Sequence, residues 1–222
     1  MSLTHLLIDL DGTISDSSPG IGRSLRAAFE ACGYAAPNDE QVRAAIGPPF
    51  ELSFPRLGVA ERDIARVIEA YRVRYEDAGM YENELYPGIV EMLTALAETF
   101  TLAVATAKPE PTARRIIQHF GLDQHFATVV GASPEVGGGR RTKAHVITHA
   151  LAVLDIGPGP HAVMVGDRNH DVDGARHNGL DCLGVAWGFG SRDELRAAGA
   201  AAIVETPAGV VDAARVAYRS GS

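Results

Sequence analysis

The sequence predicts an α/β fold, in which a Rossmann-like parallel sheet carries helices on both faces and a helical cap subdomain is inserted into it. Three observations lead to this prediction. Short apolar runs rich in β-branched residues recur along the chain, as in strands that are buried on both faces. Segments with helical periodicity separate most of these runs, which is typical of parallel sheets. Residues 18–85, which follow the first run, show no convincing strand.

The expected strands are short apolar runs bounded by polar residues or glycine. They comprise residues 5–10, 101–106, 128–133, 161–167, 180–187 and, as the weakest candidate, 201–205. Between them, apolar residues spaced by three and four positions predict amphipathic helices. These stripes are Ile89, Met92, Leu93 and Leu96; Ala113, Ile116, Ile117 and Phe120; and Val146, Ile147, Ala150, Leu151 and Leu154.

Residues 18–85 show two helical stretches, with a turn-rich break between them at Gly47-Pro48-Pro49. One apolar stripe comprises Ile21, Leu25, Ala28, Phe29 and Cys32, and a second comprises Ile64, Val67, Ile68, Tyr71 and Tyr75. Helix-breaking residues flank the block, as Ser18-Pro19-Gly20 before it and Tyr86-Pro87-Gly88 after it. We therefore expect a cap subdomain over residues 18–85 on two hinges, and an α/β core formed by residues 1–17 and 86–222.

Composition narrows the range of partners. The chain has 222 residues and a formal net charge of −8, so a nucleic acid polymer and an anionic membrane surface are poor candidates. No apolar run approaches the ~20 residues that span a bilayer, and the first residues lack a signal-peptide layout. The two cysteines show no metal-ligand spacing, which favours free thiols in a reducing compartment. We expect a cytoplasmic monomer or homodimer.

Polar side chains follow three of the expected strands at the points where those strands end. Asp9 and Asp11 leave the first strand, Thr106 and Lys108 leave the 101–106 strand, and Asp167 and Asp171 follow the 161–167 strand. Ligands of an open parallel sheet bind outside the carboxyl ends of its strands, so we expect these side chains to gather. Neighbouring carboxylates repel one another unless a cation offsets the repulsion, and oxygen-only ligands favour Mg²⁺.

Each of these motifs also has a simpler explanation when it is taken alone. Asp-x-Asp-Gly-Thr could be a polar turn after a strand, and Gly166-Asp167-x-x-x-Asp171 could be a helix N-cap. Both motifs at strand ends, in this order, favour a functional site. Lys108 directly precedes Pro109, and we interpret it as part of a loop and helix start. His170 lies inside the acidic motif, and its role is left open.

The motif set resembles that of the haloacid dehalogenase-like hydrolase superfamily. DLDGT matches its nucleophile motif and VATAKP its threonine motif; Lys143 in GGGRRTKAHVI fits its lysine position, and GDRNHDVDGARHNG fits its acidic motif. The insertion point and the IGPPF segment resemble the phosphoglycolate phosphatase-like branch with a small helical cap. The resemblance covers nearly the whole chain.

The resemblance implies a phosphoric monoester hydrolase that uses Mg²⁺. Asp9 would be the nucleophile and Asp11 the general acid and base. Asp9, Asp11 (through its backbone carbonyl), Asp167 and Asp171 would hold the metal, the last directly or through water. Thr106 with the nearby backbone N–H groups, such as that of Ala107, and Lys143 would bind the phosphoryl group.

Three alternatives to a phosphatase differ from it in substrate or in activity: a dehalogenase or phosphonatase, a mutase, and a non-catalytic member. The second aspartate, Asp11, argues for phosphate ester chemistry, because related dehalogenases and phosphonatases usually lack an acid there. A β-phosphoglucomutase-like mutase is less favoured, since SDSSPGIGRSL lacks the histidine that this branch often carries early in the cap. A non-catalytic regulatory member is the third. Among the cap arginines, Arg23 and Arg43 are the candidates to bind a second anionic group of a small metabolite such as phosphoglycolate, a nucleotide or a sugar phosphate.

Overall fold

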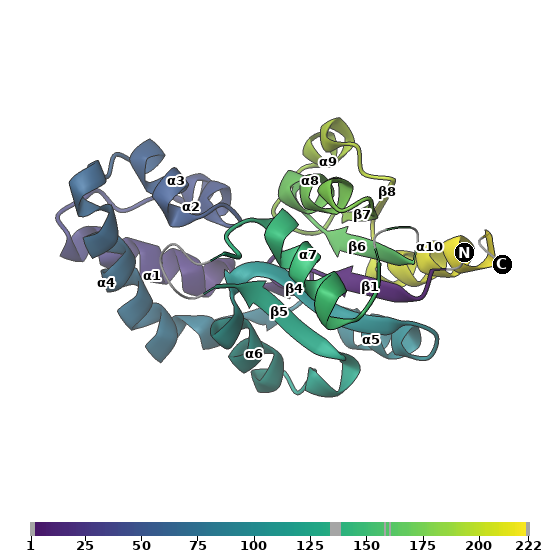
Figure 1. Ribbon diagram of the computed structural model, residues 1–222. Coiled ribbons are helices and arrows are strands. Elements are labelled where there is room, and N and C mark those ends of the chain that lie inside the picture. Colours follow the sequence, from purple (N-terminus) through teal and green to yellow (C-terminus); the bar gives the residue numbers. More distant parts are fainter. Residues whose placement is uncertain (1–2, 134–138, 158, 160, 221–222) are drawn as a thin grey trace. The chain divides into compact units, whose positions relative to one another are not determined.

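The computed structural model of the chain describes residues 3–133, 139–157, 159 and 161–220 (Figure 1). Contacts within the chain divide it into two compact units. The core unit comprises Met1–Ser15 and Leu85–Ser222, and the helical unit comprises Asp16–Glu84. That the helical unit acts as a cap for the core unit stays a prediction.

A six-stranded parallel sheet with the order β5-β4-β1-β6-β7-β8 forms the centre of the core unit. The strands are β1 His5–Ile8, β4 Thr101–Pro109, β5 Thr128–Ala132, β6 Ala162–Gly166, β7 Asp181–Val185 and β8 Ala202–Val204. Each coincides with a run that the sequence predicts as a strand, so the predicted parallel sheet is confirmed. The fully buried Leu6, Leu7 and Ile8 of β1 place this strand in the middle, between β4 and β6.

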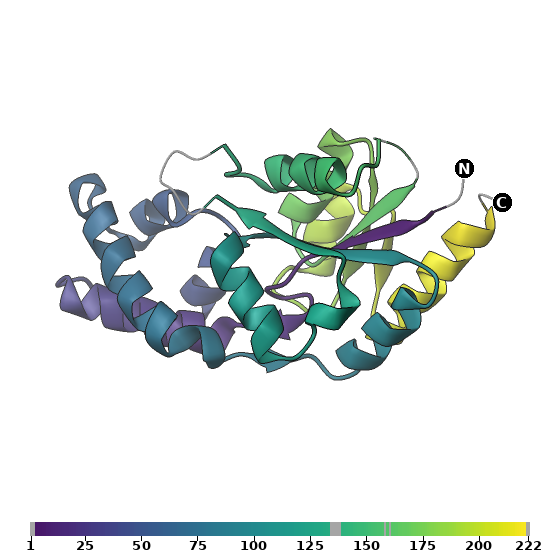
Figure 2. The same ribbon diagram turned by 60° about the horizontal axis from the view of Figure 1, so that its bottom comes forward.

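Helices cover both faces of this sheet, as the alternating pattern predicts (Figure 2). The helical elements of the core unit are α5 Ile89–Ala97, α6 Glu110–His119, η4 Asp123–His125, α7 Lys143–Val153, α8 Asn169–His177, α9 Arg192–Ala198 and α10 Pro207–Ser220. On one face, α7 and α8 bury Val146, Ile147 and Val172 against sheet residues such as Leu7 and Met164. On the other face, α5 packs beside α10, and Figure 2 shows α6 on this same side.

The helical unit packs two long helices around an aromatic core. Its elements are α1 Ser18–Ala31, α2 Asp39–Ala45, α3 Phe50–Ser53, η1 Phe54–Leu57, η2 Glu61–Asp63, α4 Ile64–Asp77 and η3 Gly79–Tyr81. The rings of Phe29 and Phe54 meet edge to face with their centroids 5.3 Å apart, and Tyr71 stacks on Tyr75 at 5.1 Å. Such aromatic pairs add to the hydrophobic free energy of burial.

The expectation that residues 18–85 lack any strand is wrong at one end. A two-stranded sheet pairs β2, Ser15–Asp16, with β3, Glu84–Leu85, where the chain passes from one unit to the other. Each of these two strands is only two residues long. A strand this short cannot show an alternating apolar pattern, so the sequence gives no signal for it.

None of the described helices is long and apolar enough to cross a membrane.

The two cysteines differ in burial, and we expect them to differ in reactivity. Cys182 of β7 is 3% exposed, and burial together with Asp171 raises the pKa of its thiol well above the ordinary value, whereas Cys32 is partly exposed. The thiolate is the reactive form, so a disulfide reagent should modify one thiol per native chain rapidly and the second only after unfolding in urea. Cys32→Ser should abolish the rapid phase. Rapid modification of both thiols in the native protein would contradict the burial of Cys182.

Candidate active site

The predicted site residues of the core unit leave the sheet at the carboxyl ends of three neighbouring strands. Asp9 directly follows β1, and Asp167 directly follows β6. Thr106 lies in β4, whose last residues extend beyond its pairing with β1. Because β1 lies between β4 and β6, residues that are far apart in the sequence arrive at one edge of the sheet.

Three carboxylates form a buried cluster at this edge. Asp9, Asp167 and Asp171 each offer one oxygen, and these oxygens all lie within 4.8 Å of one another. Asp171 belongs to the first turn of α8, where it also accepts the backbone N–H of Arg168 at 3.1 Å. Asp9 is 7% exposed, and Asp167 and Asp171 are fully buried. Burying like charges this close together is unfavourable without a cation.

Lys143, the first residue of α7, supplies one positive charge to the cluster. Its ammonium Nζ lies 2.7 Å from Asp9 Oδ1 and 2.8 Å from Asp171 Oδ1, and it donates a hydrogen bond to the carbonyl of Ala105 at 3.0 Å. Burial opposes the charged form of Lys143. The two carboxylates outweigh burial and raise the pKa of Lys143, so this side chain stays an ammonium.

One ammonium does not neutralise three carboxylates, and the pKa values of two of the carboxyl groups are raised. Burial is the main cause that raises the pKa of Asp9 to about 6, although Lys143 lowers it. Burial, with Asp171 and Asp9, raises the pKa of Asp167 to about 8. Carboxylate oxygens are hard ligands, so a converging set of them with excess negative charge fits a Mg²⁺ ion.

Lys108 is a site residue that sequence reasoning placed in the wrong element. It belongs to β4, which continues to Pro109, rather than to a loop and helix start. Its Nζ donates a hydrogen bond to Asp11 Oδ2 at 2.8 Å, and the two side chains are 6% and 14% exposed. Thr106 and Lys108 are two positions apart, which puts them on one face of a strand. That spacing was the available signal, and Pro109 obscured it.

The other carboxylate oxygen of Asp11, Oδ1, is buried and has no hydrogen-bond partner within the part of the chain that the structure describes. A buried acceptor without a partner costs about 1–3 kcal/mol. This cost is consistent with an oxygen that exchanges a proton with a bound molecule.

The structure gives less detail for the remaining predicted residues. Thr106 is buried, and its Oγ1 accepts the backbone N–H of Lys108 at 3.2 Å, while Ala107 is half-buried. Arg23 and Arg43 belong to the helical unit. Arg23 lies 3.2 Å from Glu82 Oε1 with 58% of its side chain exposed, and Arg43 is exposed in the last turn of α2. Their contacts with a substrate stay predictions.

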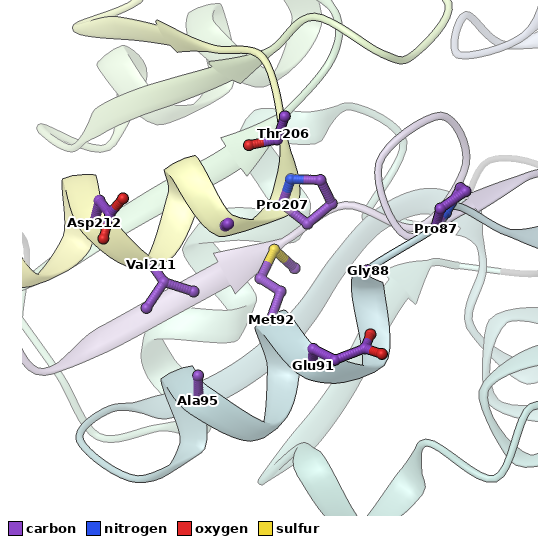
Figure 3. A pocket seen from close by; sticks show the side chains of 10 residues that line it. Pro87, Gly88, Glu91, Met92, Ala95, Thr206, Pro207, Val211 and Asp212 are labelled. Atoms are coloured by element: carbon purple, nitrogen blue, oxygen red, sulfur yellow. The ribbon is translucent and has the colours of Figure 1, made fainter.

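A groove of about 510 Å³ lies elsewhere in the core unit, between α5 and α10 (Figure 3). Figure 3 shows Met92 and Val211 lining it, together with the carboxylates of Glu91 and Asp212. Among the residues that the structure describes, no predicted site residue lines this groove, and the lining contains no lysine or arginine. It offers nothing to attract an anion, so we place the chemistry at the acidic cluster.

Comparison with known proteins identifies a family. The family described as "Haloacid dehalogenase-like hydrolase" matches residues 6–185, a range that contains every residue of the acidic cluster and Lys143. The match agrees with the predicted superfamily and with the predicted class of enzyme, a phosphoric monoester hydrolase.

Curated relatives that are more than 40% identical to this chain carry two different names. One, named "Tyrosine-protein kinase PtkA" in Mycobacterium tuberculosis, is 43% identical over 189 residues, which cover 85% of this chain. The chain spans 64% of the length of that relative. The other, named "5'-nucleotidase" in Pseudomonas aeruginosa, is 41% identical over 195 residues and covers 87% of both proteins.

Solved structures confirm the predicted fold class. A predicted phosphatase from Clostridium acetobutylicum superposes with a TM-score of 0.89 at 35% identity, over 96% of this chain and 98% of that one. The structure of M. tuberculosis PtkA superposes with a TM-score of 0.82 at 39% identity, over the same shares of the two chains.

The raised pKa values predict how the stability of the metal-free protein depends on pH. Both carboxylates bind protons more tightly in the folded than in the unfolded chain, so their contribution to stability is present below about pH 4 and is lost as pH rises through about 6 and 8. Urea unfolding in EDTA should give a free energy of unfolding that falls across this window. Asp167→Asn should remove the upper part of the fall, because an amide does not titrate. The prediction would be contradicted if the free energy of unfolding of the wild type increased relative to that of Asp167→Asn as pH rises.

Proposed function

Because the chain belongs to the haloacid dehalogenase-like hydrolase family, we propose that it is a Mg²⁺-dependent phosphatase of a small phosphorylated metabolite. The observation that carries the proposal is the buried cluster of Asp9, Asp167 and Asp171 with Lys143. A dianionic phosphate ester approaches such a cluster only when cations neutralise it. The names of the relatives, which include "5'-nucleotidase" and "Phosphoglycolate phosphatase", support the same chemistry.

The residues present fit a divalent cation. The side chains of Asp9 and Asp167 and the backbone carbonyl of Asp11 would hold it, with Asp171 binding directly or through water. Asp171 Oδ1 lies 2.8 Å from Lys143 Nζ, and Asp171 Oδ2 accepts the backbone N–H of Arg168. When bound, Mg²⁺ supplies the positive charge that draws the phosphate toward Asp9 and stabilises the transferring group.

Asp9 is the nucleophile in this proposal. Its Oδ1 accepts the backbone N–H of Leu10 at 2.8 Å and lies 2.7 Å from Lys143 Nζ, so we assign Oδ2 to the attack. Bond formation between Oδ2 and phosphorus breaks the bond from phosphorus to the leaving alkoxide, and Asp11 gives that alkoxide a proton. Asp11 then removes a proton from water, whose oxygen attacks phosphorus and releases Asp9.

The remaining residues bind the phosphoryl group or orient the side chain of Asp11. Thr106 and the backbone N–H of Ala107 donate hydrogen bonds to the phosphoryl oxygens, and Lys143 adds its positive charge. Lys108 holds Asp11 through Oδ2, which leaves Oδ1, the oxygen without a described partner, for the proton transfers.

The substrate proposed first is a nucleoside monophosphate. The relative named "5'-nucleotidase" is 41% identical, whereas one named "Phosphoglycolate phosphatase" in Mesorhizobium japonicum is 27% identical. We rank phosphoglycolate and sugar phosphates after nucleoside monophosphates as proposed substrates. Arg23 and Arg43 are the residues that we propose to contact the rest of the substrate.

A second candidate function is phosphoryl transfer to tyrosine. The relative named "Tyrosine-protein kinase PtkA" is 43% identical, although this chain spans 64% of its length. An aspartyl-phosphate can pass its phosphoryl group to a hydroxyl acceptor instead of water, so the two functions share a first step. Incubation with ATP labelled at the γ-phosphate and a tyrosine peptide distinguishes them by where the label goes.

Hydrolysis of p-nitrophenyl phosphate tests the proposed function. We expect activity with Mg²⁺ that EDTA abolishes, and a loss of about 10³-fold or more in kcat for Asp9→Asn, because the amide is no nucleophile. Asp11→Asn should lose about 10²- to 10⁴-fold, as expected for removal of a general acid and base. Asp155→Asn makes the same chemical change at an exposed position after α7 and should leave the rate unchanged.

Two results would overturn the assignment. Activity that survives Asp9→Asn would remove the nucleophile, and full activity in EDTA would remove the metal. With an active wild type, a panel of nucleoside monophosphates, phosphoglycolate and hexose phosphates ranks the substrates by kcat/KM. Turnover of a hexose phosphate only after priming with a sugar bisphosphate would indicate the mutase.

A further inference from the structure

The segment Trp187–Gly190, which reads Trp-Gly-Phe-Gly after β7, lies against Asp167. The backbone N–H of Phe189 donates a hydrogen bond to Asp167 Oδ2 at 2.7 Å. A Cβ atom at Gly188 would collide with the carbonyl oxygen of Gly12 and the side chain of Asp167, and one at Gly190 would collide with the carbonyl oxygen of Asp167. The two glycines therefore allow this loop to approach Asp167 more closely than residues with side chains could.

The second oxygen of Asp167 is held from the other side. Thr13, which is fully buried in the loop after β1, donates its hydroxyl to Asp167 Oδ1 at 3.1 Å. Each carboxylate oxygen thus accepts one hydrogen bond, from a different loop. A carboxylate held at both oxygens has few ways to rotate about its side-chain bonds.

Trp187 links these two loops. Its indole Nε1–H donates a hydrogen bond to the backbone carbonyl of Thr13 at 3.0 Å. The side chain is half-buried, and it is the single tryptophan of the chain. The bonds form a closed path from Trp187 to Thr13, from Thr13 to Asp167, and from Asp167 back to Phe189, two residues after Trp187.

We infer that residues 187–190 form a positioning loop that presets the Asp167 carboxylate for the metal, and that Trp187 acts in it through Thr13. Partners that orient a ligand raise metal affinity without touching the metal, because the ligand loses less rotational freedom on binding. This inference rests on the proposed function, since it assumes that Asp167 is a metal ligand. Trp187 is accordingly a positioning residue rather than a catalytic one.

Calorimetric titration of the substrate-free protein with Mg²⁺ tests the inference. Thr13→Val, which removes the hydroxyl, should raise the Mg²⁺ Kd by about 10- to 100-fold. Trp187→Phe, which keeps an aromatic ring and removes the donor, should raise it by about 3- to 10-fold, the worth of one hydrogen bond. Thr13→Ser keeps the hydroxyl and should bind nearly as the wild type does. Thr94→Val, which loses a threonine hydrogen bond to Val90 on the distant α5, should leave the Kd unchanged.

The double variant separates positioning from general stability. If Trp187 acts through Thr13, Thr13→Val combined with Trp187→Phe should bind Mg²⁺ no more weakly than Thr13→Val alone. The inference would be overturned if the increase in Mg²⁺ Kd of the double variant equalled the product of the two single increases, because Thr13 and Trp187 would then act independently. A Trp187→Phe variant that binds Mg²⁺ as tightly as the wild type would also overturn it.

The indole resonance provides a second measurement that needs no variant of Trp187. A single tryptophan gives one indole N–H signal in a ¹H–¹⁵N spectrum, and saturating Mg²⁺ should shift it in the wild type. A signal that does not move while calorimetry detects binding would overturn the inference, even if Trp187→Phe fails to fold. Absence of Mg²⁺ binding by the wild type would instead remove the metal site of the proposed function, and this inference with it. The two failures are therefore distinguishable.

Discussion

The mutual repulsion of buried carboxylates at one edge of the sheet is the constraint on which the rest of the site depends. Asp9, Asp167 and Asp171 are held within 4.8 Å of one another by strands and a helix that cannot move apart without breaking the core. Lys143 offsets part of the repulsion, and burial, with the neighbouring carboxylates, still raises the pKa values of Asp9 and Asp167. The acidic cluster therefore attracts cations. A phosphate ester is itself an anion, so it can approach an aspartate of this cluster only when a cation is bound there.

The order of the strands in the sheet explains how such a cluster forms from distant parts of the sequence. β1 is the first strand in the chain but lies in the middle of the sheet, with β4 and β6 as its neighbours. The loops after β1 and β6 and the end of β4 therefore converge, and α7 brings Lys143 in from one face. The hydrophobic pattern that places β1 in the core is the same feature that places Asp9 at the centre of the site.

Periodicity was sufficient to predict the parallel sheet and its flanking helices, because these depend on apolar patterns within short windows. The aspartates followed from the rule that parallel strands end at a common edge. The contact of Lys108 with Asp11 and the contacts of Thr13 and Trp187 did not follow. The contact of Lys108 depends on the continuation of β4 past Lys108 to Pro109, and those of Thr13 and Trp187 join loops more than 150 residues apart. Contacts of this range leave no trace in local spacing.

The location of the chemistry within one unit explains how relatives with the same fold can carry different names. Every residue that we assign to metal binding, nucleophilic attack and proton transfer belongs to the core unit, whereas Arg23 and Arg43, which we propose for the substrate, belong to the helical unit. In the mechanism that we propose, an aspartyl-phosphate on Asp9 can react with water or with a hydroxyl acceptor. We propose that residues outside the acidic cluster decide which acceptor reaches Asp9. A kinase name and a nucleotidase name at 43% and 41% identity are therefore compatible with the mechanism that we propose for Asp9.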